Sequence, residues 1–358
     1  MRVAMNALAW RAEPASVEAL HIQETVYLAA RQPEIDQVIL YQPASWQRIE
    51  ADKLYIVRLP EPGSALRAAA LEQWSLPRQA RARGAQLLLS AYLRPSLFTR
   101  LPQAWLDSRF DCHPPDPDSS RLGRAFDRAV SESGAERLVS SDLPAGPAPG
   151  ITRLAPWVDS RFRPERGADD MVALAGHGLR PGYVLVHGLS SIGVARILAA
   201  WTWVEGGVGD TYPLVVIAAA PEAVRTLKTA AEQAGLRSEI IVLSASRLDD
   251  LPAIYRSAAL FFQLERVRSG QSLRWAQASG LPVAGIETAT SASILGEAGY
   301  LAPANDGRAL GAACLTLLVE EELRRALAAK GLRRAERYRS DAGELVSRLA
   351  AILNEPMR

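Results

Sequence analysis

Residues 183–201 read YVLVHGLSSIGVARILAAW. They begin with an apolar run from Tyr183 to His187 that predicts a buried strand, followed by a loop over 188–193 and a helix over 194–204. The same alternation continues along the chain. It predicts strands at 213–218, 239–243, 260–264 and 282–286, and helices at 222–234, 250–257, 272–279 and 308–339. Alternating strands and helices indicate an α/β fold with a parallel sheet covered by helices.

A similar alternation precedes this stretch. It predicts strands at 3–8, 37–41, 54–57, 86–90, 137–140 and 151–156, and helices at 16–31, 66–83 and 120–133. Pro77 is expected to break or kink the helix over 66–83 because proline lacks the amide that a helix needs. Residues 107–119 are expected to form a proline-rich loop. The sequence therefore predicts two successive Rossmann-like, doubly wound parallel sheets.

The length also favours two domains, since 358 residues exceed what one hydrophobic core usually serves. The charged segment 163–170 contains Pro164 and Gly167, and we place the domain boundary there. The domains are then 1–164 and 165–340, with a C-terminal helix at 341–358 packing back on the first. Ligands of doubly wound sheets bind beyond the carboxyl ends of the strands, so a cleft between the two domains is the expected site.

The composition excludes several classes of protein. The formal charge is +2, from 41 basic and 39 acidic residues, which gives no nucleic-acid signal. The two cysteines, Cys112 and Cys314, form no zinc motif. The spacing of Asp116 and Asp118 fits a metal motif, but Pro117 between them suggests an exposed loop, and no metal is expected. No run of 18 to 20 apolar residues is present. We expect a cytoplasmic protein that at most touches the inner face of a membrane.

Five stretches carry a family likeness. They are 71–77 (LEQWSLP), 154–164 (LAPWVDSRFRP), 183–201, 251–262 (LPAIYRSAALFF), and 280–283 taken with 295–300 (GLPV and LGEAGY). In this order they resemble family-4-like glycosyltransferases, which have the GT-B fold of two Rossmann-like domains facing across a cleft. The resemblance implies transfer of a sugar from a nucleoside-diphosphate donor, with retained configuration and without metal. The nucleotide-sugar is then a co-substrate and no cofactor is required.

Three departures from the family pattern concern the reactive site. Ala9–Pro14 replaces a glycine-rich turn, and only glycine lets backbone approach a ligand closely. The loop 188–193 lacks the Arg and Lys that hold the donor diphosphate in the family. The positions of the family's two glutamates fall on Val267 and Trp275, although Glu265 could supply the first carboxylate.

The resemblance and the local chemistry together predict the site residues. We assign catalytic roles to His113 and Glu265, and acceptor-side contacts to Trp10 and Arg11. The expected donor-binding residues are His187, Gly188, Ser190, Ser191, Arg266, Arg268, Ser269, Gly270, Gln271 and Ser272. The last four lie at the start of the helix over 272–279, where unpaired amides attract phosphate. Arg196 and Arg274 are further replacement cations.

Other interpretations remain open for several of these residues. Arg266 and Arg268 could be solvated surface residues, His113 a surface histidine and His187 a satisfied edge histidine. Trp201 and Trp203 are expected in the core or an interface.

The chain is accordingly interpreted as a glycosyltransferase acting on an unknown acceptor, with domain closure joining donor and acceptor. The alternative is a catalytically degenerate homologue that binds a glycan or serves as a partner subunit. A nucleotide-sugar epimerase lacks the acidic and histidine residues that its chemistry needs. The donor, the acceptor and the oligomeric state are left open.

Overall fold

The computed structural model spans residues 1–358 and describes 1–8, 16–46, 48–91, 95–107, 135–140, 151–219, 221–243, 248–266 and 269–355. The chain divides into two compact units. Unit 1 consists of Met1–Ala12, His21–Trp157 and Arg339–Arg358, and unit 2 of Glu13–Leu20 and Val158–Tyr338. The predicted helix over 120–133 and nearly all of the loop over 107–119 lie outside the described residues.

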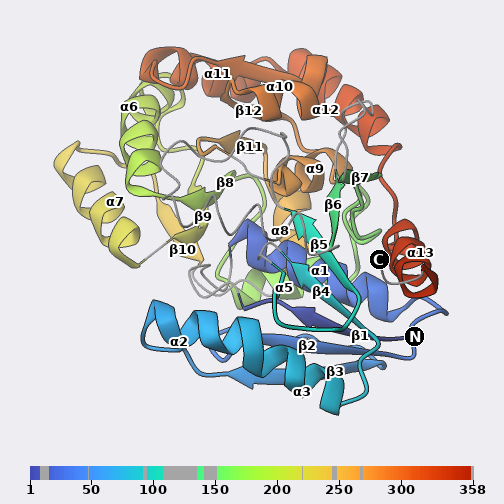
Figure 1. The fold of residues 1–358 in the computed structure, drawn as a ribbon. Helices are drawn as coiled ribbons and strands as arrows, with labels where there is room; N and C mark the ends of the chain where they lie inside the picture. Colours follow the sequence, from blue (N-terminus) through green and yellow to red (C-terminus); the bar gives the residue numbers. More distant parts are fainter. Residues whose placement is uncertain are drawn as a thin grey trace. The chain divides into compact units, whose positions relative to one another are not determined.

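Unit 1 is built on a seven-stranded sheet with the order β3-β2-β1-β4-β5-β6-β7 (Figure 1). All neighbouring strands are parallel. The strands are β1 (Arg2–Asn6), β2 (Gln37–Pro43), β3 (Leu54–Leu59), β4 (Leu87–Ala91), β5 (Gln103–Asp107), β6 (Glu136–Ser140) and β7 (Ile151–Leu154). The strand β2 is buried on both faces from Val38 to Pro43, as expected of a parallel sheet covered on both sides.

The described helices whose residues lie wholly or mostly in unit 1 are α1 (Val17–Ala30), α2 (Ala65–Ala70), the π-helix η1 (Leu71–Ser75), α3 (Leu76–Ala82) and α13 (Gly343–Asn354). Pro77 explains the π-helix, because it has no amide to donate to the Gln73 carbonyl. That carbonyl instead accepts a hydrogen bond from Ser96 Oγ at 2.7 Å. The predicted break at Pro77 is confirmed and takes the form of one wide turn just before the proline.

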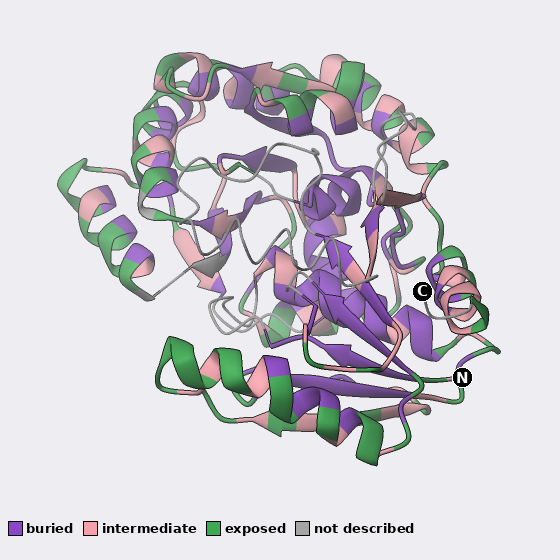
Figure 2. Cartoon of the chain, viewed as in Figure 1, coloured by how far each residue is buried: buried purple, intermediate pink, exposed green. Residues whose placement is uncertain are grey.

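One face of the unit 1 sheet is covered by α3. Leu76 and Ala80 of this helix pack on Ala4, Ile39 and Leu88, which share one register row of neighbouring strands. Figure 2 shows buried residues along these strands and exposed residues on the outer sides of α2 and α3.

The C-terminal helix α13 is fastened to this unit by charged hydrogen bonds. Arg348 donates from Nε and Nη2 to the two oxygens of Glu136 on β6, at 2.6 Å each. The Glu344 carboxylate accepts from the amide of Ala155 at 2.9 Å. Paired bonds between arginine and a carboxylate fix orientation as well as distance.

Unit 2 contains a six-stranded sheet with the order β10-β9-β8-β11-β12-β13, again parallel throughout. Its strands are β8 (Val184–Leu189), β9 (Leu214–Ala219), β10 (Ile240–Leu243), β11 (Leu260–Gln263), β12 (Val283–Ile286) and β13 (Gly299–Ala302). The predicted fold class, two Rossmann-like doubly wound sheets, is confirmed.

The described helices of unit 2 are α5 (Asp170–Gly176), α6 (Ser191–Val208), α7 (Pro221–Gln233), α8 (Leu251–Ser257), α9 (Gln271–Ala278), α10 (Ala289–Leu295), the 3-10 turn η2 (Gly296–Ala298), α11 (Gly307–Val319) and α12 (Glu321–Ala335). α6, α7 and α11 pack on the sheet face that carries Val184, Val216 and Phe262. Trp201 is buried in this core and Trp203 is half exposed. No helix within the described ranges is both long and apolar enough to cross a bilayer.

The segment that enters unit 2 is held on α8 by two arginines. Arg256 forms a bidentate pair with Asp170 at 2.7 Å, and its Nη1 donates to the carbonyls of Arg161 and Arg163. Arg161 itself pairs with Asp159 at 2.8 Å and Asp249 at 2.7 Å. These contacts fix the path of the chain before α5.

A carboxylate on α6 fastens that helix to the loop before β10. Glu205 accepts from the amide of Arg237 at 2.8 Å, and from the amide and hydroxyl of Ser238 at 3.0 and 2.8 Å. Burial raises the pKa of Glu205, but the hydrogen bonds more than offset it and hold the pKa below its usual value.

We expect Glu205→Gln to lower the free energy of unfolding by about 1–2 kcal/mol at pH 7, because charged hydrogen bonds to the two amides are weakened. A depressed folded pKa stabilises the protein above the unfolded pKa of about 4.3, and this stabilisation is lost as the pH falls through the folded value. Urea unfolding at pH 7 and at pH 3 measures both effects. A difference between variant and wild type that is equal at the two pH values contradicts the assignment.

Candidate functional site

The candidate donor site lies at the carboxyl ends of β8 and β11 in unit 2. The strand order 10-9-8-11-12-13 reverses between these two neighbours, since the chain proceeds from β8 to β9 on one side and from β11 to β12 on the other. Doubly wound sheets bind ligands at this switch point, where the loops after the two strands separate. α6 begins after β8 and α9 begins after β11. Two helix N-termini therefore open at the same edge of the sheet.

The end of β8, which contains Gly188, leads directly into the start of α6. Gly188 has φ +86°, a left-handed conformation that favours glycine. Ser190 is the N-cap of α6, and its Oγ accepts from the amide of Gly193 at 3.2 Å. Ser191 is the first residue of the helix. The helix therefore begins three residues before the predicted start at 194, because Ser190 caps it inside the predicted loop.

Glu265, from the loop after β11, binds the start of α6. Its Oε1 accepts from the amide of Ser190 at 2.6 Å and from Ser190 Oγ at 2.7 Å. A Cβ on Gly193 would lie only 2.1 Å from the same oxygen, so glycine makes room for the carboxylate. The structure thus brings together two predicted site residues, and a carboxylate occupies the N-terminus where an anion is stabilised.

The start of α9 is tightly built. Gly270 is its N-cap with φ +69°, and a Cβ there would lie 2.0 Å from Ile294 Cδ1. Ser269 is buried, and its Oγ accepts from the amide of Gln271 at 3.4 Å. The side chains of Gln271 and Ser272 are fully buried. Both whole residues are 0% exposed, and the amide of Gln271 already has an acceptor in Ser269 Oγ.

One buried arginine and one buried glutamine form hydrogen bonds that stabilise the start of α9. Arg274 is fully buried and donates from Nη1 to the carbonyl of Ser269 at 2.9 Å and to Gln271 Oε1 at 3.3 Å. Gln263, the last residue of β11, donates to the backbone carbonyl of Glu265 and lies 3.5 Å from Ser272 Oγ. Gln263 is not among the predicted site residues, because a polar residue at the end of a strand gives no signal for its partners.

The proposed replacement cations differ in their surroundings. Arg196 on α6 donates to the carbonyls of Ala304 at 2.9 Å and Leu264 at 2.8 Å. Arg196 and Arg274 therefore satisfy backbone carbonyls near the switch point. Arg266 is exposed and lies next to Glu265 in the loop before α9. Arg268 lies outside the described residues.

His187 lies in an aromatic cluster on the other face of the sheet from the α6 side. It is 2% exposed, and its Nδ1 lies 2.7 Å from Tyr255 Oη. Its ring stacks on Trp275 with centroids 5.8 Å apart, and Phe162 stacks on the same indole at 5.4 Å. The cluster fastens β8, α8 and α9 to one another, and thereby positions the start of α9.

The remaining predicted residues, Trp10, Arg11 and His113, lie outside the described residues. In the part of the chain that the structure describes, no group of three or more His, Cys, Asp or Glu side chains could hold a metal ion.

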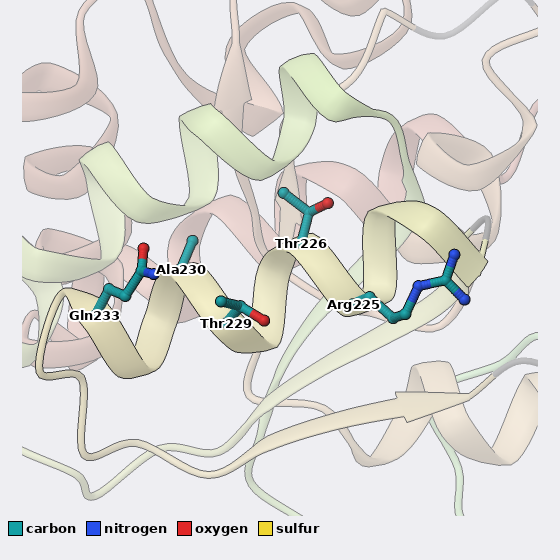
Figure 3. A pocket seen from close by; sticks show the side chains of 5 residues that line it. All are labelled: Arg225, Thr226, Thr229, Ala230 and Gln233. Atoms are coloured by element: carbon teal, nitrogen blue, oxygen red, sulfur yellow. The ribbon is translucent and has the colours of Figure 1, made fainter.

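A shallow surface hollow lies away from the switch point, along α7 (Figure 3). Its lining comes from that one helix and consists of Arg225, Thr226, Thr229, Ala230 and Gln233. Arg225 pairs with Glu222 at 2.9 Å on the same exposed surface. A single solvated helix surface does not bring together groups from different elements, so it offers no reactive arrangement.

Comparison with known proteins gives a fold but no sequence family. No family model matches the chain, and no curated protein matches it in sequence. Among solved structures, WaaG, a glycosyltransferase involved in lipopolysaccharide biosynthesis, is 16% identical with a TM-score of 0.72, covering 99% of this chain and 100% of WaaG.

Two further solved structures are similar to this chain over nearly its whole length. Anabaena Alr3699/HepE in complex with UDP and glucose is 13% identical, with a TM-score of 0.72 and coverage of 99% and 100%. Sucrose-phosphate synthase from Thermosynechococcus elongatus is 12% identical, with a TM-score of 0.71 and coverage of 99% and 98%. The structural neighbours are GT-B glycosyltransferases, and the predicted GT-B fold is confirmed.

Proposed function

We propose that this chain is a glycosyltransferase that transfers a sugar from a nucleoside-diphosphate donor to an acceptor, with retained configuration and without a metal ion. The observation that carries the proposal is the similarity over 99% of the chain to glycosyltransferase structures, one of them in complex with UDP-glucose. The switch point between β8 and β11 adds support, because two helix N-termini open there.

The proposal assigns the donor diphosphate to the start of α9. The amides of Gln271 and Ser272 open this helix, and Gly270 allows the backbone to turn sharply into it. Arg266 adds a positive charge just before the turn, and Arg268 is assigned the same role from the sequence. Gly188, Ser190 and Ser191 line the neighbouring loop, and His187 acts from the core by holding Trp275.

The reaction then breaks the bond between the sugar's anomeric carbon and the diphosphate oxygen. The acceptor oxygen forms the new bond on the same face, and the leaving diphosphate takes the acceptor's proton. Glu265 is proposed to contact the sugar, and His113, Trp10 and Arg11 to serve the acceptor. The loop 188–193 lacks the Arg and Lys that hold the donor diphosphate in family-4-like glycosyltransferases. Without these two cations the leaving group would be less stabilised by roughly 3–6 kcal/mol, at about 1.5–3 kcal/mol for each charged hydrogen bond.

A panel of UDP-, GDP- and ADP-sugars, followed by thermal shift and calorimetry, tests the proposal. We expect one donor to bind, and Arg266→Ala to weaken it roughly 10- to 100-fold through loss of one charged hydrogen bond. Arg225→Ala is the matched control, since this exposed arginine lies on α7. Absence of binding by every donor, together with absence of donor hydrolysis, contradicts the proposal.

A second function is favoured by the contacts of Glu265. Its carboxylate already accepts two hydrogen bonds at the start of α6, and Arg196 and Arg274 already bind carbonyls. A degenerate homologue that binds a glycan or a partner would keep such purely structural contacts.

Glu265→Gln separates the two functions, because it keeps the shape of the side chain and removes its charge. For an active transferase that uses this carboxylate on the sugar, turnover falls at least tenfold while affinity for the free nucleoside diphosphate is unchanged. For the degenerate homologue, wild type has no turnover and the substitution changes only the melting temperature.

A further inference from the structure

Two aromatic rings are stacked in solvent on unit 1. Trp74 of η1 and Phe98 of the loop before β5 have ring centroids 4.6 Å apart and planes inclined by 23°. Trp74 is 42% exposed and Phe98 is 57% exposed. Exposed single apolar side chains are ordinary, but two large rings from separate elements that meet at the surface are characteristic of an interaction site.

A buried polar network holds the two rings in place. Gln73, beside Trp74, accepts from the amide of Leu97 at 2.8 Å and donates to the carbonyl of Pro95 at 3.3 Å. Gln103 bonds both the amide and the carbonyl of Ser96, at 2.9 and 2.8 Å. These hydrogen bonds fix the loop to η1, and the fixed loop places Phe98 beside Trp74.

The exposed side of the preceding helix extends this surface. Leu66, Ala70 and Trp74 follow one another at intervals of four residues, and all three are exposed. Leu66 is 84% exposed, the largest value among the exposed large hydrophobic side chains of the described residues. Leu66, Trp74 and Phe98 are called the aromatic patch below.

Positive charge accompanies the aromatic patch. The exposed arginines of the same segments are Arg67, Arg78, Arg81 and Arg100. The described residues between 64 and 100 contain one further arginine, Arg83, and a single acid, Glu72. Within the described ranges, none of the four exposed arginines forms an ion pair. Arg67 on α2, Trp74 on η1, and Arg78 and Arg81 on α3 are all exposed, so positive charge lies before and after the tryptophan along these consecutive elements.

We propose that the aromatic patch and its arginines dock unit 1 on the surface of an anionic lipid bilayer. Tryptophan and phenylalanine enter the boundary between headgroups and acyl chains, while arginines bind lipid phosphates. Charge selects this occupant over a second copy of the chain. A twofold contact would bring the same four unpaired arginines toward their own copies, and like charges repel. This inference stands independently of the proposed transferase activity.

Co-sedimentation of the full chain with lipid vesicles tests the docking. We expect binding to phosphatidylglycerol–phosphatidylcholine vesicles and little binding to pure phosphatidylcholine vesicles. Trp74→Ser with Phe98→Ser should lower the partition coefficient at least tenfold, because both rings leave the apolar boundary. Arg78→Gln with Arg81→Gln should lower it roughly 25-fold, at about fivefold for each of the two positive charges removed. The arginine variant changes only exposed side chains and therefore preserves the fold.

Trp203→Ser is the matched control. Trp203 is also a half-exposed tryptophan beside an arginine, with Arg308 5.1 Å from its ring, but it lies on α6 of unit 2. Its substitution should leave vesicle binding unchanged. Equal binding to charged and neutral vesicles, or wild-type binding by both patch variants with melting temperatures intact, overturns the proposal. So does a dimer in light scattering that the Trp74 and Phe98 substitutions dissociate.

Discussion

Arg256→Ala should lower the free energy of unfolding of unit 2 by about 3–5 kcal/mol, the cost of leaving one charge of a buried pair unpaired. The Arg256 and Asp170 side chains are 7% and 9% exposed. The guanidinium also donates to the backbone carbonyls of Arg161 and Arg163. Alanine therefore leaves the buried carboxylate of Asp170 with only the amide of Gly167 as donor and removes the donor of both carbonyls. Unfolding in urea, followed by circular dichroism, measures the loss.

The pH dependence of this loss distinguishes the ion pair from simple packing. The hydrogen bond from Arg256 holds the pKa of Asp170 below its usual value. A depressed carboxylate pKa stabilises the fold above the unfolded pKa of about 3.9 and loses that effect as the pH falls through the folded value. The difference between wild type and Arg256→Ala should therefore be full at pH 7 and smaller at pH 3.

Arg225→Ala provides the comparison for an exposed pair. Arg225 and Glu222 are 72% and 85% exposed, although their charged atoms are 2.9 Å apart. A solvated pair of this kind contributes at most a few tenths of a kcal/mol, so this variant should unfold like wild type. A loss of similar size in both variants would show that burial does not determine the energy of these pairs.

The strands and helices that the sequence predicts correctly are those with continuous apolar runs. β2, β8 and β9 each contain an uninterrupted run of aliphatic residues that is buried on both faces, so these apolar runs identify the strands. The strand β5 is missed because its buried residues include Gln103, a polar side chain that bonds the amide and the carbonyl of Ser96 in the preceding loop. β13 is missed because four residues beginning with glycine carry little strand signal. β5 and β13 form strands because they pair with β4 and β12, and this pairing is not visible in the local sequence.

The positions of the loops that form the candidate site can be predicted from the sequence, but the side-chain contacts within the site cannot. Glycine and serine at 269–272 indicate a helix start, and α9 begins there at Gln271. The loop predicted over 188–193 is shorter in the structure, because α6 begins at Ser191. The hydrogen bonds between Glu265 and Ser190 join residues 75 positions apart, so no local pattern announces them. The same holds for His187 on β8, whose partners Tyr255 and Trp275 come from the helices α8 and α9. Such pairs depend on the order of the strands, which brings β8 beside β11.

Gly311→Ala should destabilise unit 2 by about 2 kcal/mol, in the range for overpacking, although alanine is the better helix former. Gly311 lies inside α11, and a Cβ there would lie 2.6 Å from the backbone oxygen of Ala200 and 2.7 Å from the Cβ of Trp203, both on α6. Neither atom can rotate away, so the two helices must separate. Their shared face contributes Ile197, Leu310 and Cys314 to the core.

Gly206→Ala should do the opposite and stabilise the unit by about 0.5 kcal/mol, since it removes glycine's backbone entropy cost. Gly206 is also inside a helix, α6, and no atom lies within 4 Å of where its Cβ would be. Thermal unfolding of the two variants should therefore shift in opposite directions from wild type. Because both substitutions add one methyl group to a helical glycine, intrinsic propensity predicts the same sign for both. Only the close approach of α6 and α11 separates them, and two melting temperatures raised together would mean that these helices are not packed at this distance.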